Sequence, residues 1–448
     1  MSLADDLNLG CMCRTLQTGR LQAQLETDTR LAGMTARLAL SHPHLFSNSA
    51  VFMDPAIAET LARAVATIER VIALPAYREH ALAHAPAIAR HDFGPAGVFM
   101  GYDFHIANAL PHLIEINTNA GGAFLNAALS RAHTECCAPM HPLFAGADRH
   151  PPFEDTFMAM FHAEWQAQRG DAPLRSVLIV DDEPESQYLA PEFELACQLF
   201  QHHGLSAAVG DARQLRWHDG ALWHPALPEG LRVDLVYNRV TDFDLSDPAH
   251  QSLRAAYEAG AAVVTPHPRA HALHANKSNL ITLSDDALLA GWGVSPQDRQ
   301  LLQQVVPRTE AVTPAVADDL WARRRTLFFK PVAGYGAKAA YRGDKLTRRV
   351  WAEICAGGFV AQALVPPSER LVNVDGVATR LKLDVRAYTY RGQVQLLAAR
   401  SYQGQTTNFR TEGGGFSPVV VLPAGMPPMA ELAKAMALHN PTAVGLDQ

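Results

Sequence analysis

The chain has 448 residues, 48% of them hydrophobic, and a formal net charge of −7. This composition provides enough apolar side chains for two or three folded domains. The acidic balance and the lack of a long basic run argue against general nucleic-acid binding. No stretch approaches the roughly 18 consecutive apolar residues of a membrane span, and the polar first residues do not resemble a signal peptide. We therefore expect a globular cytoplasmic protein that binds neither nucleic acid nor membrane.

The six cysteines match no zinc motif, because neither Cys11-x-Cys13 nor Cys136-Cys137 has the second pair that a structural zinc site uses. Reduced, mostly buried thiols are expected.

Residues 1–40 are polar and predict partly irregular structure. From Asp54 to Leu74, apolar residues recur at three- and four-residue spacing, which predicts an amphipathic helix with Asp54 as N-cap and proline at the first helical position.

Two polar side chains interrupt an apolar run that ends in a turn. Residues 113–122 read Leu-Ile-Glu-Ile-Asn-Thr-Asn-Ala-Gly-Gly, which predicts a strand that closes at the glycines. Alternation along a strand places Glu115 and Asn117 on one face. Residues 98–103 predict a second strand that ends in Asp103, and the short loop between the strands predicts a hairpin. The three polar residues would then form a platform for Mg²⁺, although hairpins also carry such residues on a solvated face.

Residues 172–270 show strands and helices in alternation. The expected strands are 177–182, 207–209, 233–239 and 262–265, and the expected helices are 191–203 and 248–259. This alternation is typical of a doubly wound, mainly parallel sheet. No GxGxxG motif follows the first strand, so a dinucleotide site is not predicted.

Two lysines in the last third of the chain predict a phosphate-binding lobe. Lys277 lies at the start of a helix, and Lys330 lies on a strand that precedes a glycine-containing loop. Ammonium groups supply charge, and such a loop supplies backbone N–H donors. A later extended segment has the character of a hinge that binds adenine through its backbone. The expected nucleotide-contacting residues are Lys277, Lys330, Gly334, Tyr335, Gly336, Gln362, Ala363, Leu364 and Val365. An ordinary hairpin turn and a solvated strand lysine are the alternatives.

Charged side chains also follow the last predicted strands. Residues 381–390 alternate so that Asp384 and Arg386 share one face, and residues 394–400 are expected to be the hairpin partner. Arginines aimed into a cavity would stabilise charge that develops on a transferring phosphoryl group or a tetrahedral intermediate. A surface ion-pair ladder is an equally good explanation of the pattern alone.

Taken together, these segments resemble an ATP-grasp nucleotide site. The resemblance is carried by Lys330, Gly334-Tyr335-Gly336, Gln362, Asp384-Val385-Arg386, Arg400 and the run Asn408-Phe-Arg-Thr-x-Gly-Gly-Gly. The segment Asp384-Val385-Arg386, Arg400 and the run that begins at Asn408 are similar to motifs of peptide-tag ligases in the same superfamily. In the usual ATP-grasp order the metal strands come last, whereas here Asp103, Glu115 and Asn117 come first. That order and spacing resemble the circularly permuted ATP-grasp family that includes the synthetase half of glutathionylspermidine synthase.

The resemblance implies a fold, a domain layout and a site. The fold is α/β: a circularly permuted ATP-grasp unit with a doubly wound domain. The implied domains are residues 1–150 with the metal strands, 172–270 with the doubly wound sheet, and 271–448 with the nucleotide-binding lobes. ATP and Mg²⁺ are the implied cofactors. The residues expected at the reaction centre are Arg239, Arg386, Arg400, Asn408 and Arg410.

The implied activity is ATP-dependent ligation of a small-molecule or peptide carboxylate to an amine through an acyl phosphate. Arg239 and Arg386 would face the acyl phosphate or the acceptor. Two alternatives are a small-molecule phosphotransferase of the same fold and a non-catalytic nucleotide-binding protein. The complete sets of acidic and basic residues favour an enzyme.

Overall fold

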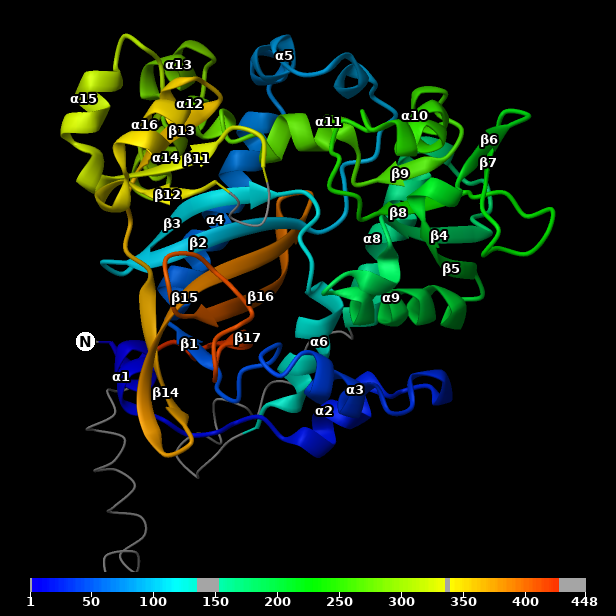
Figure 1. Cartoon of the computed structure of the whole chain (residues 1–448), viewed down its shortest axis with the longest axis horizontal. Helices are drawn as coiled ribbons and strands as arrows, with labels where there is room; N and C mark the ends of the chain where they lie inside the picture. Colours follow the sequence, from blue (N-terminus) through cyan, green and yellow to red (C-terminus); the bar gives the residue numbers. More distant parts are fainter. Residues whose placement is uncertain (1, 135–152, 335–338, 427–448) are drawn as a thin grey trace, which may run out of the picture.

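The structure, a computed structural model, describes residues 2–134, 153–334 and 339–426. Its strands form three larger sheets and one two-stranded ribbon. In Figure 1 a central sheet is flanked by a lobe of yellow elements at the upper left and a lobe of green elements at the right. Within the described residues, no helix is long and apolar enough to cross a membrane.

The largest sheet combines strands from both ends of the chain. Its order is β1-β17-β16-β15-β2-β3, and β14 pairs with β15. The strands are β1 (Val51–Met53), β2 (Met100–Ala107), β3 (Leu110–Asn117), β14 (Ser368–Val374), β15 (Val377–Tyr390), β16 (Gln393–Tyr402) and β17 (Gly415–Val421). The predicted hairpin of β2 and β3 is present, and β2 lies antiparallel to β15 with Asp103 opposite Arg386. The N-terminal hairpin and the C-terminal strands therefore form one continuous sheet.

A long amphipathic helix packs against this sheet. Helix α4 (Pro55–Ile72) buries Leu61, Val65 and Ile68 in the same core as side chains of β3 and β15. Asp54 occupies the predicted N-cap position, but its side chain makes no capping hydrogen bond. Helix α5 (Pro75–Ala83) follows directly.

The first 40 residues are more regular than their composition predicts. They form the helices α1 (Leu3–Gly10), α2 (Thr18–Leu25) and α3 (Met34–Ser41). Leucines of α2 and α3 pack against helix α6 (Ala123–Ala132) and Phe416 of β17. Each of these three helices has eight residues and only two or three buried side chains, so the sequence contains too few turns for a periodic pattern.

A second, antiparallel sheet carries Lys330. Its order is β10-β13-β11-β12, with β10 (Thr309–Ala311), β11 (Leu327–Pro331), β12 (Tyr341–Arg342) and β13 (Phe359–Ala363). The helices of this lobe are α12 (Asn279–Leu283), α13 (Asp286–Gly291), α14 (Pro296–Val305), α15 (Ala317–Ala322) and α16 (Arg348–Cys355). Phe329 and Trp351 pack in its core.

The third sheet is parallel, as the sequence predicts. Its order is β5-β4-β8-β9, with β4 (Ser176–Asp181), β5 (Ser206–Asp211), β8 (Leu235–Asn238) and β9 (Val263–Thr265). Ile179 lies in one apolar cluster and Val180 in another, so both faces are covered. The helices are α8 (Phe153–Arg169), α9 (Ala190–His202), α10 (Gln251–Glu258) and α11 (Pro268–Ala270). A ribbon of β6 (Arg216–His218) and β7 (Ala221–Trp223), which the sequence did not indicate, lies beside α10 (Figure 1).

A buried carboxylate joins the parallel sheet to the central sheet. Glu164 of α8 is fully buried. Its oxygens accept hydrogen bonds from the backbone N–H groups of Ala96 (2.8 Å) and Gly97 (2.7 Å) and from the hydroxyls of Thr265 (2.6 Å) and Tyr390 (2.9 Å). Thr265 belongs to β9 and Tyr390 to β15, so one side chain fixes the relative position of the two sheets.

We expect the substitution Glu164→Ala to lower the free energy of unfolding by about 3 kcal/mol or more, because each buried donor left without an acceptor costs roughly 1–3 kcal/mol. The midpoint of urea unfolding measures the effect. Gln166→Ala, at an exposed position of the same helix, is the matched control and should change stability by less than about 0.5 kcal/mol. Equal stability of the two variants would contradict this role for Glu164.

Candidate active site

The three predicted metal-binding residues lie together on the β2–β3 hairpin. Asp103 on β2 is paired directly with Glu115 on β3, and Asn117 is paired with Gly101. The Asn117 amide nitrogen lies 3.2 Å from Asp103 Oδ2 and 3.3 Å from Glu115 Oε1. The alternation predicted for Glu115 and Asn117 is thus present, and the hairpin adds Asp103 to the same face.

Two arginines hold Asp103 from the other side. Arg386 of β15 donates from Nε to Asp103 Oδ1 (2.6 Å) and from Nη2 to Oδ2 (2.8 Å), and Arg400 of β16 donates from Nη2 to Oδ2 (2.8 Å). Arg400 Nε also donates to Asp384 Oδ1 (2.7 Å). Burial alone would raise the pKa of Asp103, but the two guanidinium groups lower it to about 2. Asp103 is therefore a carboxylate at neutral pH, and the arginines form a buried network with it.

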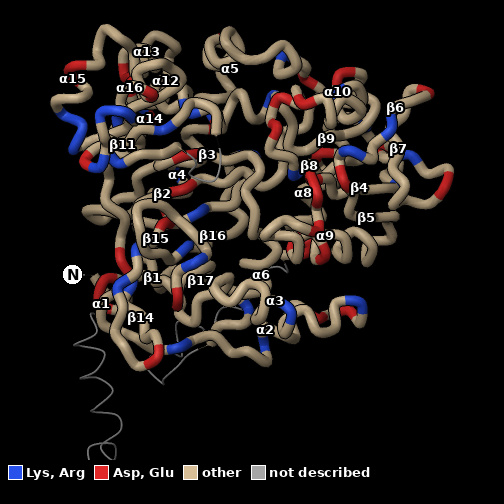
Figure 2. Tube along the Cα trace, viewed as in Figure 1, with Lys and Arg blue, Asp and Glu red and all other residues tan. Residues whose placement is uncertain are grey.

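Both predicted phosphate-binding lysines reach this hairpin. Lys277 Nζ lies 3.8 Å from Glu115 Oε2 and donates to the Gly334 carbonyl (2.9 Å). Lys330 Nζ donates to the carbonyl of Ile114, in the strand that carries Glu115 (2.6 Å), and to Gln362 Oε1 (2.9 Å). Figure 2 shows acidic positions on β2 and β3 close to basic positions of neighbouring elements. The acids and the lysines, more than 150 residues apart in the chain, thus face each other where the two antiparallel sheets meet.

Burial and charge act in opposite directions on these groups. Burial would raise the pKa of Glu115, but Lys277 and Lys330 hold it below its ordinary value. Burial lowers the pKa of Lys330 to about 8, although the nearby Glu115 favours the ammonium form. Of the two carboxylates on the hairpin, Glu115 is the more exposed, at 28% for its side chain against 2% for Asp103.

The donor set on the hairpin fits Mg²⁺. Within the described residues, no group of three or more histidine, cysteine or carboxylate side chains has the geometry to enclose a metal ion. Two carboxylates and an amide oxygen are instead the partial oxygen set that suits Mg²⁺, which retains water ligands and binds substrate phosphates. Asp103 already accepts hydrogen bonds on both oxygens, so Glu115 has the greater free capacity for a cation.

The predicted adenine hinge is already engaged within the protein. Gln362 is buried and contacts Lys330 and the Leu113 carbonyl. The N–H groups of Ala363 and Leu364 donate to the carbonyls of Arg308 and Thr326 (both 2.8 Å), and His105 Nδ1 donates to the Val365 carbonyl (2.8 Å). The segment therefore joins the lysine sheet to β2. Of the predicted glycine-containing loop, Gly334 contacts Lys277, while Tyr335 and Gly336 lie outside the described residues.

Within the described residues, Asn408 and Arg410 form no hydrogen bond or ion pair with the hairpin residues or the lysines, unlike most of the other predicted site residues. Asn408 Oδ1 accepts from the backbone N–H of Arg410 and from the Thr411 hydroxyl (both 3.0 Å), so its side chain stabilises its own turn. Arg410 is exposed. The neighbouring Thr407 instead donates to Asp384, and this contact connects the loop to Arg400.

Arg239 approaches the site from the parallel sheet. It follows β8 and is buried, with Nη2 3.9 Å from Glu192 Oε2 and Nη1 3.5 Å from the Tyr237 hydroxyl. Its Nε has no hydrogen-bond partner among the described residues. Glu192 accepts from the backbone N–H groups of Gly122 (2.8 Å) and Phe124 (3.1 Å). Arg239 therefore lies beside the turn that follows β3, the strand that carries Glu115 and Asn117.

The structure adds residues that sequence reasoning missed. The His271 Nδ1 atom shares a hydrogen bond with the Thr118 hydroxyl (3.3 Å), and its ring stacks on Phe243 with centroids 3.9 Å apart. Burial and the charge of Lys277 lower the pKa of His271 to about 3. His271 begins a helix of five residues (His271–Ala275), which is too short to give a periodic signal. Its position six residues before Lys277 was the one available indication.

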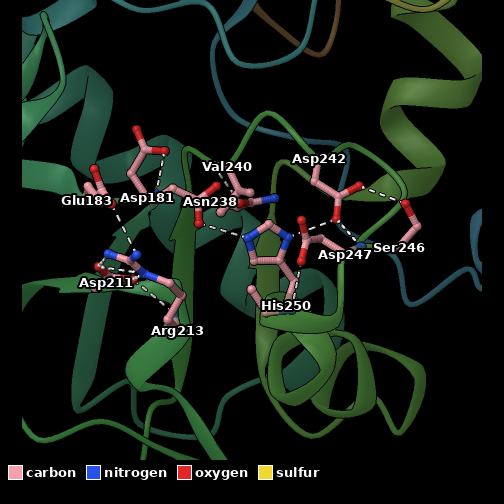
Figure 3. Close-up of polar contacts among 12 residues, drawn as sticks. Asp181, Glu183, Asp211, Arg213, Asn238, Val240, Asp242, Ser246, Asp247 and His250 are labelled. Carbon is pink, nitrogen blue, oxygen red and sulfur yellow. Dashed lines mark hydrogen bonds and ion pairs between the residues drawn. The ribbon is translucent and has the colours of Figure 1, made fainter.

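A second missed histidine fixes the loop after β8. His250 is buried, and its Nδ1 atom lies 2.8 Å from Asp242 Oδ2 (Figure 3). Its Nε2 atom lies 2.8 Å from Asp182 Oδ1. Burial opposes the charged imidazolium, but the two carboxylates raise the pKa of His250 above its ordinary value. Both ring nitrogens are engaged, so His250 connects the carboxyl end of β4 to the loop that begins at Arg239.

Comparisons with known proteins give a match in structure and none in sequence. No protein-family model matches the chain, and no curated protein matches it. A glutathione synthetase-like effector from Globodera pallida superposes with a TM-score of 0.55 at 11% identity, over 90% of this chain and 97% of that one. A putative gamma-glutamylcysteine synthetase from Methylobacillus flagellatus gives 0.45 at 12% identity, over 84% and 90%. The ATP-grasp ligase PsnB, complexed with minimal precursor, Mg and ADP, gives 0.25 at 14% identity, over 59% and 98%.

The first of these likenesses extends over nearly the whole of both chains, and at this identity it shows the fold alone. The sheets, their order and this likeness agree with the predicted α/β class. The acidic hairpin precedes the lysine sheet in the chain. The fold of this chain is thus similar to that of the glutathione synthetase-like effector.

Proposed function

We propose that this protein is an ATP- and Mg²⁺-dependent carboxylate–amine ligase that forms an amide bond through an acyl phosphate. The observation that carries the proposal is the contact of the Glu115 carboxylate with Lys277, together with the hydrogen bond from Lys330 to the same strand. An acidic strand and two buried lysines facing each other suit a polyphosphate with its metal ion. The resemblance of the sequence motifs to an ATP-grasp nucleotide site and the likeness of the fold to a glutathione synthetase-like protein support the same function.

The reaction would proceed in two steps. A substrate carboxylate oxygen attacks the γ-phosphorus of ATP, and ADP leaves. An amine nitrogen then attacks the carbonyl carbon of the acyl phosphate, loses a proton, and inorganic phosphate leaves. Such phosphoryl transfer requires mainly positioning and charge stabilisation from the protein.

The residues of this chain divide these tasks. Glu115, Asn117 and Asp103 would hold Mg²⁺, which supplies charge neutralisation to the phosphate oxygens when bound. Lys277 and Lys330 would bind phosphate oxygens from the opposite side, with the Gly334 carbonyl fixing the first lysine. In this scheme Gln362 positions Lys330, and the segment up to Val365 borders the adenine.

The arginines would act on the transferring group. Arg386 and Arg400 are buried beside Asp103, and their positive charges would stabilise negative charge that develops on this group. Arg239, with a buried Nε that lacks a partner among the described residues, is suited to a carboxylate or the acyl phosphate. Asn408 and Arg410 would contribute through the loop that carries Thr407.

We expect Glu115→Gln and Asn117→Ala each to lower phosphate release by roughly 100-fold or more, because each removes an oxygen ligand or its charge from the reaction centre. Folding should change little, since the Glu115 side chain is 28% exposed and the glutamine has the same shape. Steady-state phosphate release and the thermal midpoint measure the two effects.

Glu353→Gln is the matched control for that experiment. It removes the same charge from an exposed position of α16, where the side chain is 57% exposed. This variant should retain full activity, because exposed ion pairs contribute little. Full activity in Glu115→Gln would rule out the metal assignment.

Nucleotide binding should depend on pH through Lys330. Its pKa is lowered to about 8 in the free protein, and bound phosphate would favour the ammonium and raise that pKa. Binding should therefore take up a proton at pH values just above 8, and affinity should fall as pH rises through this range. Calorimetric titration in two buffers with different ionisation enthalpies measures the uptake. Lys330→Arg keeps the charge and should abolish the uptake; an unchanged uptake would assign the proton to another group.

A substrate screen tests the activity itself. Magnesium-dependent phosphate release is measured with amino acids, small peptides and polyamines, alone and in carboxylate–amine pairs, with Glu115→Gln as the inactive reference. Release that requires both a carboxylate and an amine supports ligation. Release with a stable phosphorylated product and no need for an amine would contradict it in favour of a phosphotransferase. Tight ATP binding without turnover on any pair would contradict catalysis.

A further inference from the structure

A hollow of about 400 Å³ lies at the opposite end of the parallel sheet from the candidate active site. Arg175 directly precedes β4, Asp234 directly precedes β8, and Ala261 lies two positions before β9. The hollow is therefore at the amino ends of the strands, whereas Arg239 follows the carboxyl end of β8. Its volume is in the range of small-molecule sites.

The charge of the hollow is unbalanced. Three arginines line it, Arg169, Arg175 and Arg232, and the lining contains one carboxylate, Asp234. Asp234 Oδ1 lies 3.2 Å from Arg232 Nε, and its Oδ2 accepts the backbone N–H of Arg175 (3.0 Å). The guanidinium of Arg175 has no ion-pair partner among the described residues. One carboxylate thus offsets one of three positive charges. The two positive charges that remain would be neutralised by a dianion.

One of the three arginines is held in place by the protein backbone. Arg169 Nη2 donates to the carbonyl of Gly260 (2.8 Å) and to that of Ala261. Burial and the like charge of Arg232 lower the pKa of Arg169. Arg175 and Arg232 are exposed and can adjust to a ligand. The like charges of the three arginines favour an anion between them, and the planar fork of arginine suits phosphate and carboxylate oxygens.

Two indole rings complete the lining. Trp165 is 5% exposed and its Nε1 donates to the Ala172 carbonyl (2.6 Å), so its ring is held in one orientation. Trp223 on β7 stacks against His218, with ring centroids 5.4 Å apart. Indole faces bind planar groups by stacking. The lining therefore combines an anion-binding side with a flat apolar side.

We propose that this hollow is a second ligand site, which binds a small dianion attached to a planar ring, such as an aryl or nucleoside phosphate monoester. The site uses Arg175 and Arg232 for the dianion and Trp223 for the ring. It does not depend on the ligase proposal, because none of these residues contacts the β2–β3 hairpin.

Phenyl phosphate is the probe, and tryptophan fluorescence of the full chain is the readout. We expect saturable quenching that benzyl alcohol, the neutral analogue, does not produce. Arg175→Glu should weaken the affinity by roughly tenfold or more, because it replaces an anion-binding charge with a repelling one. Trp223→Phe should reduce the amplitude of the quenching.

Two controls locate the binding. Arg63→Glu makes the same charge change at an exposed position of α4 and should leave the affinity unchanged. Glu115→Gln should also leave it unchanged, which separates this hollow from the candidate active site. Phosphate release in Arg175→Glu should equal that of the parent protein. Absence of saturable quenching, equal affinity in Arg175→Glu, or a loss of affinity in Glu115→Gln would overturn the proposal.

Discussion

The carboxylate of Asp103 lies buried between the guanidinium groups of Arg386 and Arg400, and the central sheet depends on this contact. The partners are 283 and 297 positions away in the chain, so the triad joins the N-terminal hairpin to strands near the other end. Taking three charges out of water is unfavourable unless close hydrogen bonds compensate for the lost hydration. Here Asp103 accepts from Arg386, Arg400 and Asn117 at distances from 2.6 to 3.2 Å, which provides that compensation and fixes the hairpin against β15.

This constraint determines the charge that the site presents. Since Asp103 is occupied by the arginines, Glu115 is the one carboxylate of the hairpin that Lys277 approaches. Two lysines and two arginines then meet three carboxylates, Asp103, Glu115 and Asp384. The excess of positive charge is small, so a triphosphate alone would be under-neutralised, whereas a triphosphate with a divalent cation would be closer to neutral. The charges of the site would thus favour a nucleotide that binds together with a metal ion.

The sequence was sufficient for the strands and for the placement of Glu115, because alternation along a short apolar strand is a local property. It was also sufficient for the parallel sheet, whose strands are apolar on both faces. It could not reveal that Asp103 binds two arginines, since ion pairing across a sheet depends on strand order and not on spacing. The motif of Asn408 predicted a place at the reaction centre. In the structure its amide stabilises the local turn, and a catalytic role stays a prediction. The helices of the first 40 residues were missed because their packing partners, such as Phe416, come from distant segments.

The turn at Gly121 and Gly122 shows how the parts are coupled. A Cβ atom at position 121 would lie 2.4 Å from Leu189 and 2.9 Å from Arg239 Nη2, and one at position 122 would lie 2.3 Å from Phe416. Gly122 also has a φ of +99°, which favours glycine. The Gly121 carbonyl accepts from the Tyr388 hydroxyl at 2.8 Å, and Arg386 Nη1 lies 3.5 Å from it. Gly121 thus allows the approach of Arg239 from the parallel sheet and contacts β15 of the central sheet. A side chain at position 121 would push Arg239 away from this turn, and one at position 122 would push Phe416 away from it. The glycines are therefore as much a part of the site as the charged residues that they bring together.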